Sequence, residues 1–220
     1  LVADRWYTGV RRELLRESVR NEVIPTGTAL ETSLRGRMGL LHGLSSFLEI
    51  HWDKADRTVE FDRFAVDILR DVPGVLSIQF VGSNGVITHV WPEAGNERAI
   101  GKNVLEDPRP GTVADFRRAL TDSGIVISGP TELYQGGVGL IGRLAARDAR
   151  DSVIAVTAVV VRLEPIAEEA GLHNIPTIRT ALLDEEGALV LGDSSLIRAG
   201  AEPITASVKF DGREWRLLAV

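Results

Sequence analysis

Cysteine is absent from this chain of 220 residues, and with it go several kinds of chemistry. No disulfide can form, no thiolate can act as a nucleophile, and no zinc site built on cysteine is available. The formal net charge is -6, and the basic residues are interleaved with Asp and Glu. Binding to nucleic-acid phosphates needs clustered Lys and Arg, so the sequence argues against a nucleic-acid partner.

Long hydrophobic runs are absent as well. The best one, residues 153–161, is interrupted by Thr157 and is far shorter than the roughly 20 residues that span a bilayer. No secretory signal peptide is evident. The chain begins inside an expected helix and ends just after an expected strand, so we expect it to be trimmed from a larger, membrane-anchored protein.

Constellations that carry out catalysis are also missing. The four histidines, at positions 42, 51, 89 and 173, are not spaced three or four residues apart, so no local metal site is indicated. No G-x-S-x-G nucleophile elbow occurs. Gly137, Gly139 and Gly142 spell G-x-G-x-x-G, with Glu164 at a distance suited to a ribose contact, but no helix of usable length fits after them. Glycines that thin a strand where a ligand or another backbone comes close explain this pattern better than a dinucleotide site.

The apolar and charged fractions, 44% and 25%, are those of an ordinary folded protein with one large or two small domains. The first fifty residues show helical periodicity on both sides of Pro25. Because proline lacks an N–H and crowds the preceding turn, we expect a kink or break there, with Thr26 or Thr28 capping a second helix to about Trp52. A third helix is expected over residues 61–69.

Strand patterns follow the turn signal Pro73-Gly74. Residues 75–81 and 86–91 predict a hairpin around Gly82-Ser83-Asn84-Gly85. If Val81 faces Val86, one face carries Leu76, Ile78, Phe80, Ile87, His89 and Trp91, and the other carries Ser77, Gln79, Val86 and Thr88. A helix over residues 113–120 and strands at 125–128, 138–144 and 153–161 complete a PAS-type order. Two hairpins after a short helix at 164–170 predict a second, smaller sheet.

Polar residues that interrupt the predicted strands are candidates for a binding pocket, because pockets are mostly apolar with a few placed polar groups. The alternative is that they point to solvent, which the cost of burying an unpaired charge favours for Arg143. His89 could equally be a core or rim histidine with one satisfied nitrogen. The strand residues considered are Gln79, Thr88, His89, Ser128, Arg143 and Thr157.

Several short motifs in the middle of the chain occur in a characteristic order and spacing. They are Pro73-Gly74-Val75, residues 90–97, Ala99-Ile100-Gly101, Ser128-Gly129-Pro130, Leu133, Gln135-Gly136-Gly137 and Gly139-Leu140. In these motifs the chain resembles the CHASE domain, an extracytoplasmic sensor module of membrane-bound histidine kinases, nucleotide cyclases and diguanylate cyclases. The motifs span about a third of the chain. One departure is Arg143-Leu144-Ala145-Ala146, where the family usually ends the strand with an apolar residue, proline and valine.

The resemblance implies an α+β fold: a long N-terminal helix, then tandem PAS-like antiparallel sheets, the larger membrane-distal and holding the ligand pocket, the smaller membrane-proximal. The expected domains are residues 1–58, 59–170 and 171–220. In cytokinin-binding members a carboxylate and a threonine contact the purine. The corresponding positions here are at or near Asn96, which is not an acid, and at Ser128. The resemblance therefore implies no cytokinin-type purine contact through a carboxylate, while Ser128 keeps a hydroxyl facing the same pocket.

Together these patterns predict an extracytoplasmic small-molecule sensor domain in the periplasm, without a cofactor, that dimerises through its N-terminal helix and is anchored by membrane segments outside this sequence. The alternatives are a small α+β hydrolase and a ligand-free dimerisation spacer. The predicted ligand-binding residues are Gln79, His89, Trp91, Asn96, Ser128, Tyr134, Arg143 and Thr157.

Overall fold

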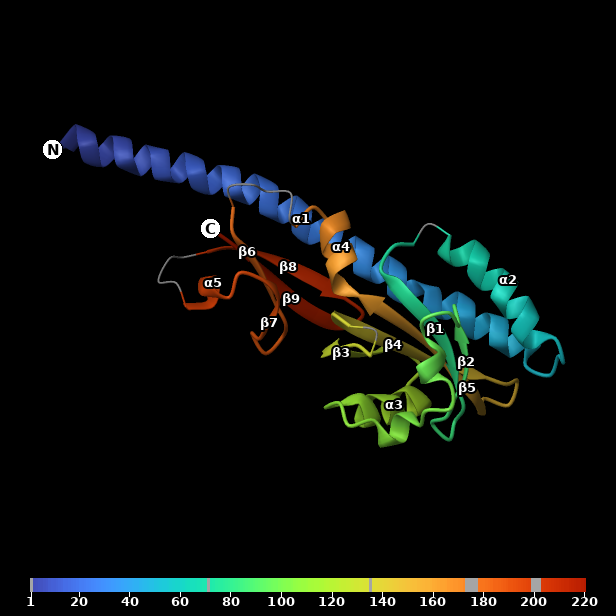
Figure 1. Cartoon of the computed structure of the whole chain (residues 1–220). Helices are drawn as coiled ribbons and strands as arrows, with labels where there is room; N and C mark the ends of the chain where they lie inside the picture. Colours follow the sequence, from blue (N-terminus) through green and yellow to red (C-terminus); the bar gives the residue numbers. More distant parts are fainter. Residues whose placement is uncertain (1, 71, 135, 173–177, 199–202) are drawn as a thin grey trace. The chain divides into compact units, whose positions relative to one another are not determined.

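The computed structural model describes residues 2–70, 72–134, 136–172, 178–198 and 203–220 (Figure 1). For residues 2–10 and 12 it describes the backbone but not the side chains. His173, Gln135 and the side chains of Trp6 and Val10 therefore lie outside what is described. The chain forms two compact units, Leu1–Leu34 with Ala167–Val220, and Arg35–Ile166. The N-terminal helix thus contributes to both units, whereas the sequence prediction set it apart as a stalk. None of the described helices is long and apolar enough to cross a membrane.

Helix α1 runs without interruption over Val2–His51 with Pro25 inside it, so of the two expected outcomes, a kink or a break, the break does not occur. The threonines do not cap a new helix. Thr26 Oγ1 donates to the Glu22 carbonyl at 2.9 Å and Thr28 Oγ1 to that of Ile24 at 3.2 Å. Packing explains why proline is tolerated, since buried residues continue on both sides of it. These buried residues are Val23, Leu30, Leu34, Met38, Leu41, Leu44 and Leu48.

The unit Arg35–Ile166 is built on a five-stranded antiparallel sheet in the order β2-β1-β5-β4-β3. Its strands are β1 (Val75–Val81), β2 (Ile87–Trp91), β3 (Val126–Glu132), β4 (Val138–Arg147) and β5 (Val153–Arg162). Its helices are α2 (Arg57–Leu69), α3 (Thr112–Thr121), the first residues of α4 (Leu163–Glu169), and two short 3-10 helices, η1 (Glu97–Ala99) and η2 (Val104–Glu106). The predicted order of strands and helix is confirmed.

The β1–β2 register differs from the predicted one, in which Val81 faces Val86. Phe80 pairs with His89 and Ile78 with Trp91, so these four residues still share one face, as predicted. A β-bulge then pairs Val81 with Ile87, which moves Ile87 to the face of Gln79 and Val81. Strand β4 also extends three residues beyond the predicted end at Leu144, pairing with β5 as far as Arg147.

The two faces of this sheet have different partners. On one face, Phe61 of α2 packs on Phe80 with ring centroids 4.2 Å apart, and Phe47 of α1 lies 5.6 Å from Phe61. A Cβ on Gly142 would come within 2.5 Å of Met38 Sδ, so glycine lets α1 lie close to β4. Gly139 and Gly142 therefore thin β4 where other groups come close, as predicted, whereas Gly137 lies just before the strand; among the described elements, β4 rather than a phosphate-binding helix follows Gly137.

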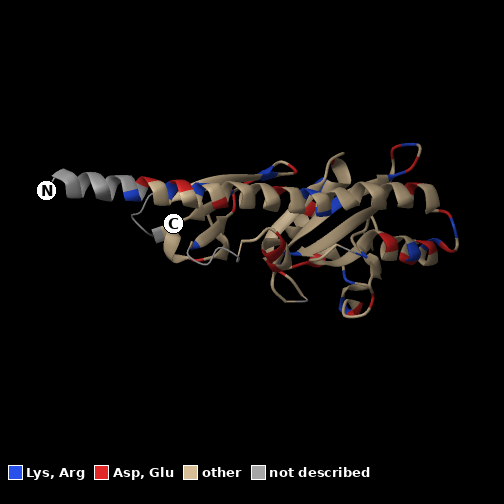
Figure 2. Ribbon diagram, turned by 90° about the horizontal axis from the view of Figure 1, so that it is seen from above, with Lys and Arg blue, Asp and Glu red and all other residues tan. Residues whose placement is uncertain are grey.

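The unit Leu1–Leu34 with Ala167–Val220 contains the predicted smaller sheet, in the order β7-β6-β9-β8. Its elements are β6 (Thr180–Leu183), β7 (Leu189–Gly192), β8 (Ile204–Phe210), β9 (Arg213–Ala219) and the single-turn α5 (Ser195–Arg198). Trp215 is fully buried against Phe210, with ring centroids 5.0 Å apart. Figure 2 shows that charges of both signs alternate along the helices and loops, while the strands carry few.

Candidate functional site

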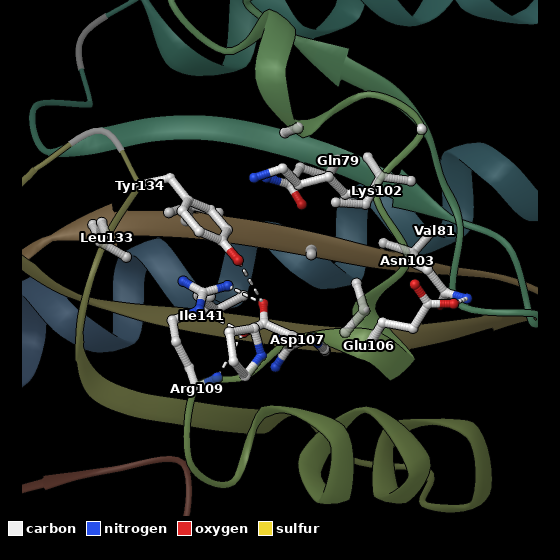
Figure 3. Close-up of a pocket in the computed structure, with 18 residues that line it drawn as sticks. Gln79, Val81, Lys102, Asn103, Glu106, Asp107, Arg109, Leu133, Tyr134 and Ile141 are labelled. Atoms are coloured by element: carbon white, nitrogen blue, oxygen red, sulfur yellow. Dashed lines mark hydrogen bonds and ion pairs between the residues drawn. The ribbon is translucent and has the colours of Figure 1, made fainter.

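A cavity of about 510 Å³ lies on the other face of the five-stranded sheet, entirely within the unit Arg35–Ile166 (Figure 3). Its size is typical of small-molecule pockets. Side chains of β1, β4 and β5 form one wall, and the segment 99–109 together with the end of β3 forms the other. The lining residues are Gln79, Val81, Ile87, Ala99, Gly101, Lys102, Asn103, Val104, Glu106, Asp107, Pro108, Arg109, Leu133, Tyr134, Ile141, Arg143, Ala158 and Val160.

The β1–β2 hairpin fixes the segment that covers the cavity. The N–H of Ile87 donates to the Lys102 carbonyl at 2.9 Å, and the N–H of Val104 donates to the Gly85 carbonyl at 2.8 Å. Gly85 adopts φ +85°, and a Cβ there would meet Asn103 Oδ1 at 2.5 Å. Glycine at the hairpin turn therefore permits both the left-handed backbone and the close approach of this segment.

Asp107 and Arg109 form a compact ion pair at the cavity wall. Arg109 Nε and Nη2 donate to the two Asp107 carboxylate oxygens at 2.9 and 2.5 Å, and the Arg109 backbone N–H donates to Oδ1 at 2.9 Å. The Asp107 side chain is only 6% exposed. Burial would raise the pKa of Asp107, but the hydrogen bonds from Arg109 outweigh it and hold that pKa below its ordinary value.

Tyr134 lies between two cations at the edge of the cavity. Lys102 Nζ is 3.7 Å from the centre of its ring, and the Arg109 guanidinium carbon is 4.3 Å from it. The Tyr134 hydroxyl points to Asp107 Oδ2 at 3.4 Å, as Figure 3 shows. Burial, with the nearby Asp107 carboxylate, raises the pKa of Tyr134. The ring is thus held by cation–π contacts on the segment that covers the sheet.

Arg143 is the buried cation of the cavity, with 2% of its surface exposed. Its register partners place it in one row with Ala158 and Gln79 across β4, β5 and β1. Arg143 Nη1 donates to Ser128 Oγ, and Gln79 Nε2 donates to Ser77 Oγ at 3.2 Å. Burial lowers the pKa of Arg143 to about 10, so the guanidinium is still charged at neutral pH.

The structure brings only part of the predicted site together. Gln79, Tyr134 and Arg143 line the cavity, and Ser128 contacts Arg143 from β3. Asn96 is buried outside it, where its Nδ2 donates to the Pro92 carbonyl at 2.9 Å and to that of Leu76 at 3.2 Å.

The remaining three predicted residues lie on the helix-covered face. His89 Nε2 is 2.9 Å from Asp62 Oδ1, with Phe61 beside the imidazole ring. Thr157 Oγ1 donates to the Leu144 carbonyl at 3.0 Å, and Trp91 pairs with Ile78 on this same face. None of the three lines the cavity. A polar residue on a strand does not reveal by itself which face is covered.

Sequence reasoning missed the charged residues of the covering segment, namely Lys102, Glu106, Asp107 and Arg109. The segment between β2 and α3 reads as an ordinary loop, and only the hairpin contacts fold it over the sheet. Among the described residues, no three His, Asp or Glu side chains are grouped so that they could hold a metal ion.

Neither the family models nor the curated proteins give a match to this sequence. Several solved structures, however, are similar to the chain in fold. An extracellular ligand-binding receptor from Desulfohalobium retbaense is 14% identical with a TM-score of 0.71 over 90% of this chain, which spans only 39% of that receptor. The ligand-binding domain of the Pseudomonas aeruginosa amino acid chemoreceptor PctC, in complex with GABA, is 18% identical with a TM-score of 0.68, covering 94% of this chain and 99% of that domain.

The ligand-binding domain of the Pseudomonas fluorescens chemoreceptor CtaA, in complex with L-serine, is 14% identical with a TM-score of 0.65, covering 95% of this chain and 98% of that domain. Extracellular domains of putative histidine kinases are similar as well, with TM-scores of 0.62 and 0.66. The chain therefore shares the fold of extracellular ligand-binding domains, with a long helix and two antiparallel sheets.

Proposed function

We propose that this chain is an extracytoplasmic sensor domain that binds a small molecule in the cavity of its five-stranded unit. The observation that carries the proposal is the contrast between the two faces of that sheet. One face is filled by α1 and α2, whereas the other leaves about 510 Å³ open beside buried polar side chains. A packed interior has few voids larger than a water molecule, so a space of this size indicates a site for a ligand.

The similar solved structures support the same assignment. PctC was solved with GABA and CtaA with L-serine, and both are chemoreceptor domains of nearly the same extent as this chain. A sensor of this kind belongs to a membrane-bound signalling protein, as the CHASE resemblance also implies. The output domain is then a histidine kinase, a diguanylate cyclase or a phosphodiesterase in the cytoplasm.

Signal transmission is assigned to helix α1. The helix contributes residues to both units, so a conformational change in either unit can be transmitted along one continuous helix. A ligand drives such a change only through its differential affinity for two conformations. Leu14 and Leu15 of α1 are 61% and 60% exposed, which suits a helix that packs against the same helix of a second subunit.

Dimerisation can be tested by analytical ultracentrifugation. We expect a dimer that dissociates on the double substitution Leu14→Glu and Leu15→Glu, because charges would enter the apolar helix contact. Exchanging the exposed Glu13 and Glu17 for alanine is the matched control on the same part of α1 and should leave the dimer intact. A wild-type protein that stays monomeric at high concentration would contradict the dimer.

Ligand binding can be tested by thermal unfolding against a metabolite panel. A ligand present at a hundred times its dissociation constant adds about 2.7 kcal/mol to the free energy of unfolding. We expect at least one compound to raise the melting temperature, and substitutions in the cavity to abolish that rise. If no compound stabilises the protein, a ligand-free spacer describes it better. Apolar spans encoded on either side of this segment would support the membrane anchor.

A further inference from the structure

Among the described residues, Arg37 and Arg143 are the buried cations, and Arg143 is the one that lines the cavity. Its side chain shares a row with Gln79 and Ala158, and only 2% of its surface is exposed. Ala158 presents a single methyl group between two long polar side chains. No bulky side chain therefore covers the sheet between Gln79 and the Arg143 guanidinium.

The guanidinium has a hydroxyl as its hydrogen-bond partner, Ser128 Oγ, and no carboxylate of the described residues lies within ion-pair distance of it. Asp115 and Asp107 attract it only from beyond that distance, and burial still outweighs them in lowering its pKa. The nearest cavity carboxylate, Asp107, is already occupied by Arg109 through two side-chain hydrogen bonds. Burying a charge is costly unless it is paired, so the Arg143 guanidinium lacks an anion in direct contact with it.

The net charge of the residues that line the cavity also favours an anionic ligand. Lys102, Arg109 and Arg143 contribute three positive charges, against the two carboxylates of Glu106 and Asp107. Arg109 is paired with Asp107, and Lys102 is exposed and lies over the Tyr134 ring, so Arg143 is the buried cation of this lining without a carboxylate at ion-pair distance. Guanidinium binds carboxylates through two parallel hydrogen bonds, which gives both strength and orientation.

We propose that the ligand is a small organic anion whose carboxylate is received by Arg143, with Ser128 and Gln79 beside it. This inference rests on the proposed function, since it specifies the class of molecule that the sensor binds. The rest of the ligand lies along Ile141 and Val160 towards Tyr134, which all line the same cavity.

The experiment compares matched compounds on the same protein. One panel holds L-amino acids, GABA and short mono- and dicarboxylates. The other holds their carboxamides, sugars and polyamines. Thermal unfolding finds the binders, and isothermal titration calorimetry gives their affinities. We expect the binders to be carboxylates, and the carboxamide of the best one to bind about 30-fold more weakly or worse, because a charge-assisted pair is lost.

The substitution Arg143→Gln should weaken carboxylate binding by a similar factor of about 30 or more. It should leave the melting temperature of the unliganded protein unchanged or higher, because it removes a buried charge that has no counter-ion. Arg147→Gln is the matched control: it removes the same charge from the same strand outside the cavity, and should keep wild-type affinity.

Three results would overturn the inference. If only neutral or cationic compounds bind, the carboxylate class is wrong while the sensor function stands. If a carboxylate binds wild type and Arg143→Gln equally well, Arg143 is not its receptor. If neither panel contains a binder, the inference and the sensor function both fail. Should Arg143→Gln not fold, the comparison of each carboxylate with its carboxamide on the wild-type protein still decides.

Discussion

The two faces of the five-stranded sheet are made by the same strands but have opposite characters. Phe80, His89 and Thr157 point to one face, and Gln79, Ala158 and Arg143 point to the other. Phe61 of α2 packs on Phe80 and His89 of the first set, whereas the second set borders a cavity. Alternation along a strand thus lets one short sequence provide both a packed core and a binding surface.

The largest effect on stability is expected on the packed face. Phe61→Ala should lower the free energy of unfolding by about 3–5 kcal/mol, because Phe61 is fully buried against Phe80 and Phe47. Chemical denaturation measures this change. Leu133→Ala, at the cavity, should cost only about 2 kcal/mol, since its truncation enlarges an existing space. Equal losses of unfolding free energy for Phe61→Ala and Leu133→Ala would show that the two faces are packed equally well.

A matched pair of substitutions on β5 tests which face of the sheet has free space. Ala155 and Ala158 are both buried, but their odd spacing places them on opposite faces. Ala155→Met should destabilise the protein by about 1–3 kcal/mol through overpacking. Ala158→Met should change stability by less than about 1 kcal/mol, because its side chain enters the cavity. The reverse order of stabilities would show that the open face has been misassigned.

The ion pair at the cavity wall predicts a dependence on pH. Asp107→Asn should cost about 1–2 kcal/mol at pH 7, because Arg109 loses its carboxylate partner. The pKa of Asp107 is lowered in the folded state, so its contribution is present above the unfolded value of about 3.9 and is lost as pH falls through the folded value. The difference between wild type and variant should therefore shrink in urea titrations below about pH 4.

The control for this titration is Asp122→Asn, which removes a half-exposed carboxylate from the end of α3. Its effect should stay within about 0.5 kcal/mol at either pH. A gap between wild type and Asp107→Asn that persists unchanged at pH 3 would contradict the assigned role of the Asp107 charge.

The smallest effect is expected at the edge of the cavity. Tyr134→Phe keeps the ring between Lys102 and Arg109 and removes only a hydroxyl 3.4 Å from Asp107. Its melting temperature should correspond to a loss of less than about 0.5 kcal/mol. Tyr134→Leu, which also removes the cation–π contacts, should cost somewhat more, about 0.5–1 kcal/mol. A larger loss for the phenylalanine variant would show that the hydroxyl is the main contact.

Local patterns predicted the fold well, because each strand and helix has its own periodicity. The PAS-type order, the second sheet and the thinned strand at Gly142 all follow from residues close in sequence. At Pro25 the sequence left open whether the helix kinks or ends, and it continues because buried contacts on both sides hold α1 together despite the missing N–H. Tertiary packing of this kind is not visible in a local pattern.

The site was harder to predict than the fold. Polar residues on strands drew attention to Gln79 and Arg143, but equally to His89 and Thr157 on the packed face. The bulge after Phe80 also moved Ile87 across the sheet. Asp107 and Arg109 depend on a loop held by the hairpin at Gly85, which only three-dimensional contacts reveal.

Whether the ligand binds in the cavity of the five-stranded unit can be decided by a calorimetric titration of Ala158→Met with the compound that binds the wild-type protein. The methionine side chain fills the floor of the cavity between Gln79 and Arg143 while leaving the packed face untouched. We expect no measurable binding by this variant, although it melts at the wild-type temperature. Wild-type affinity in the variant would instead show that the ligand binds elsewhere in the molecule.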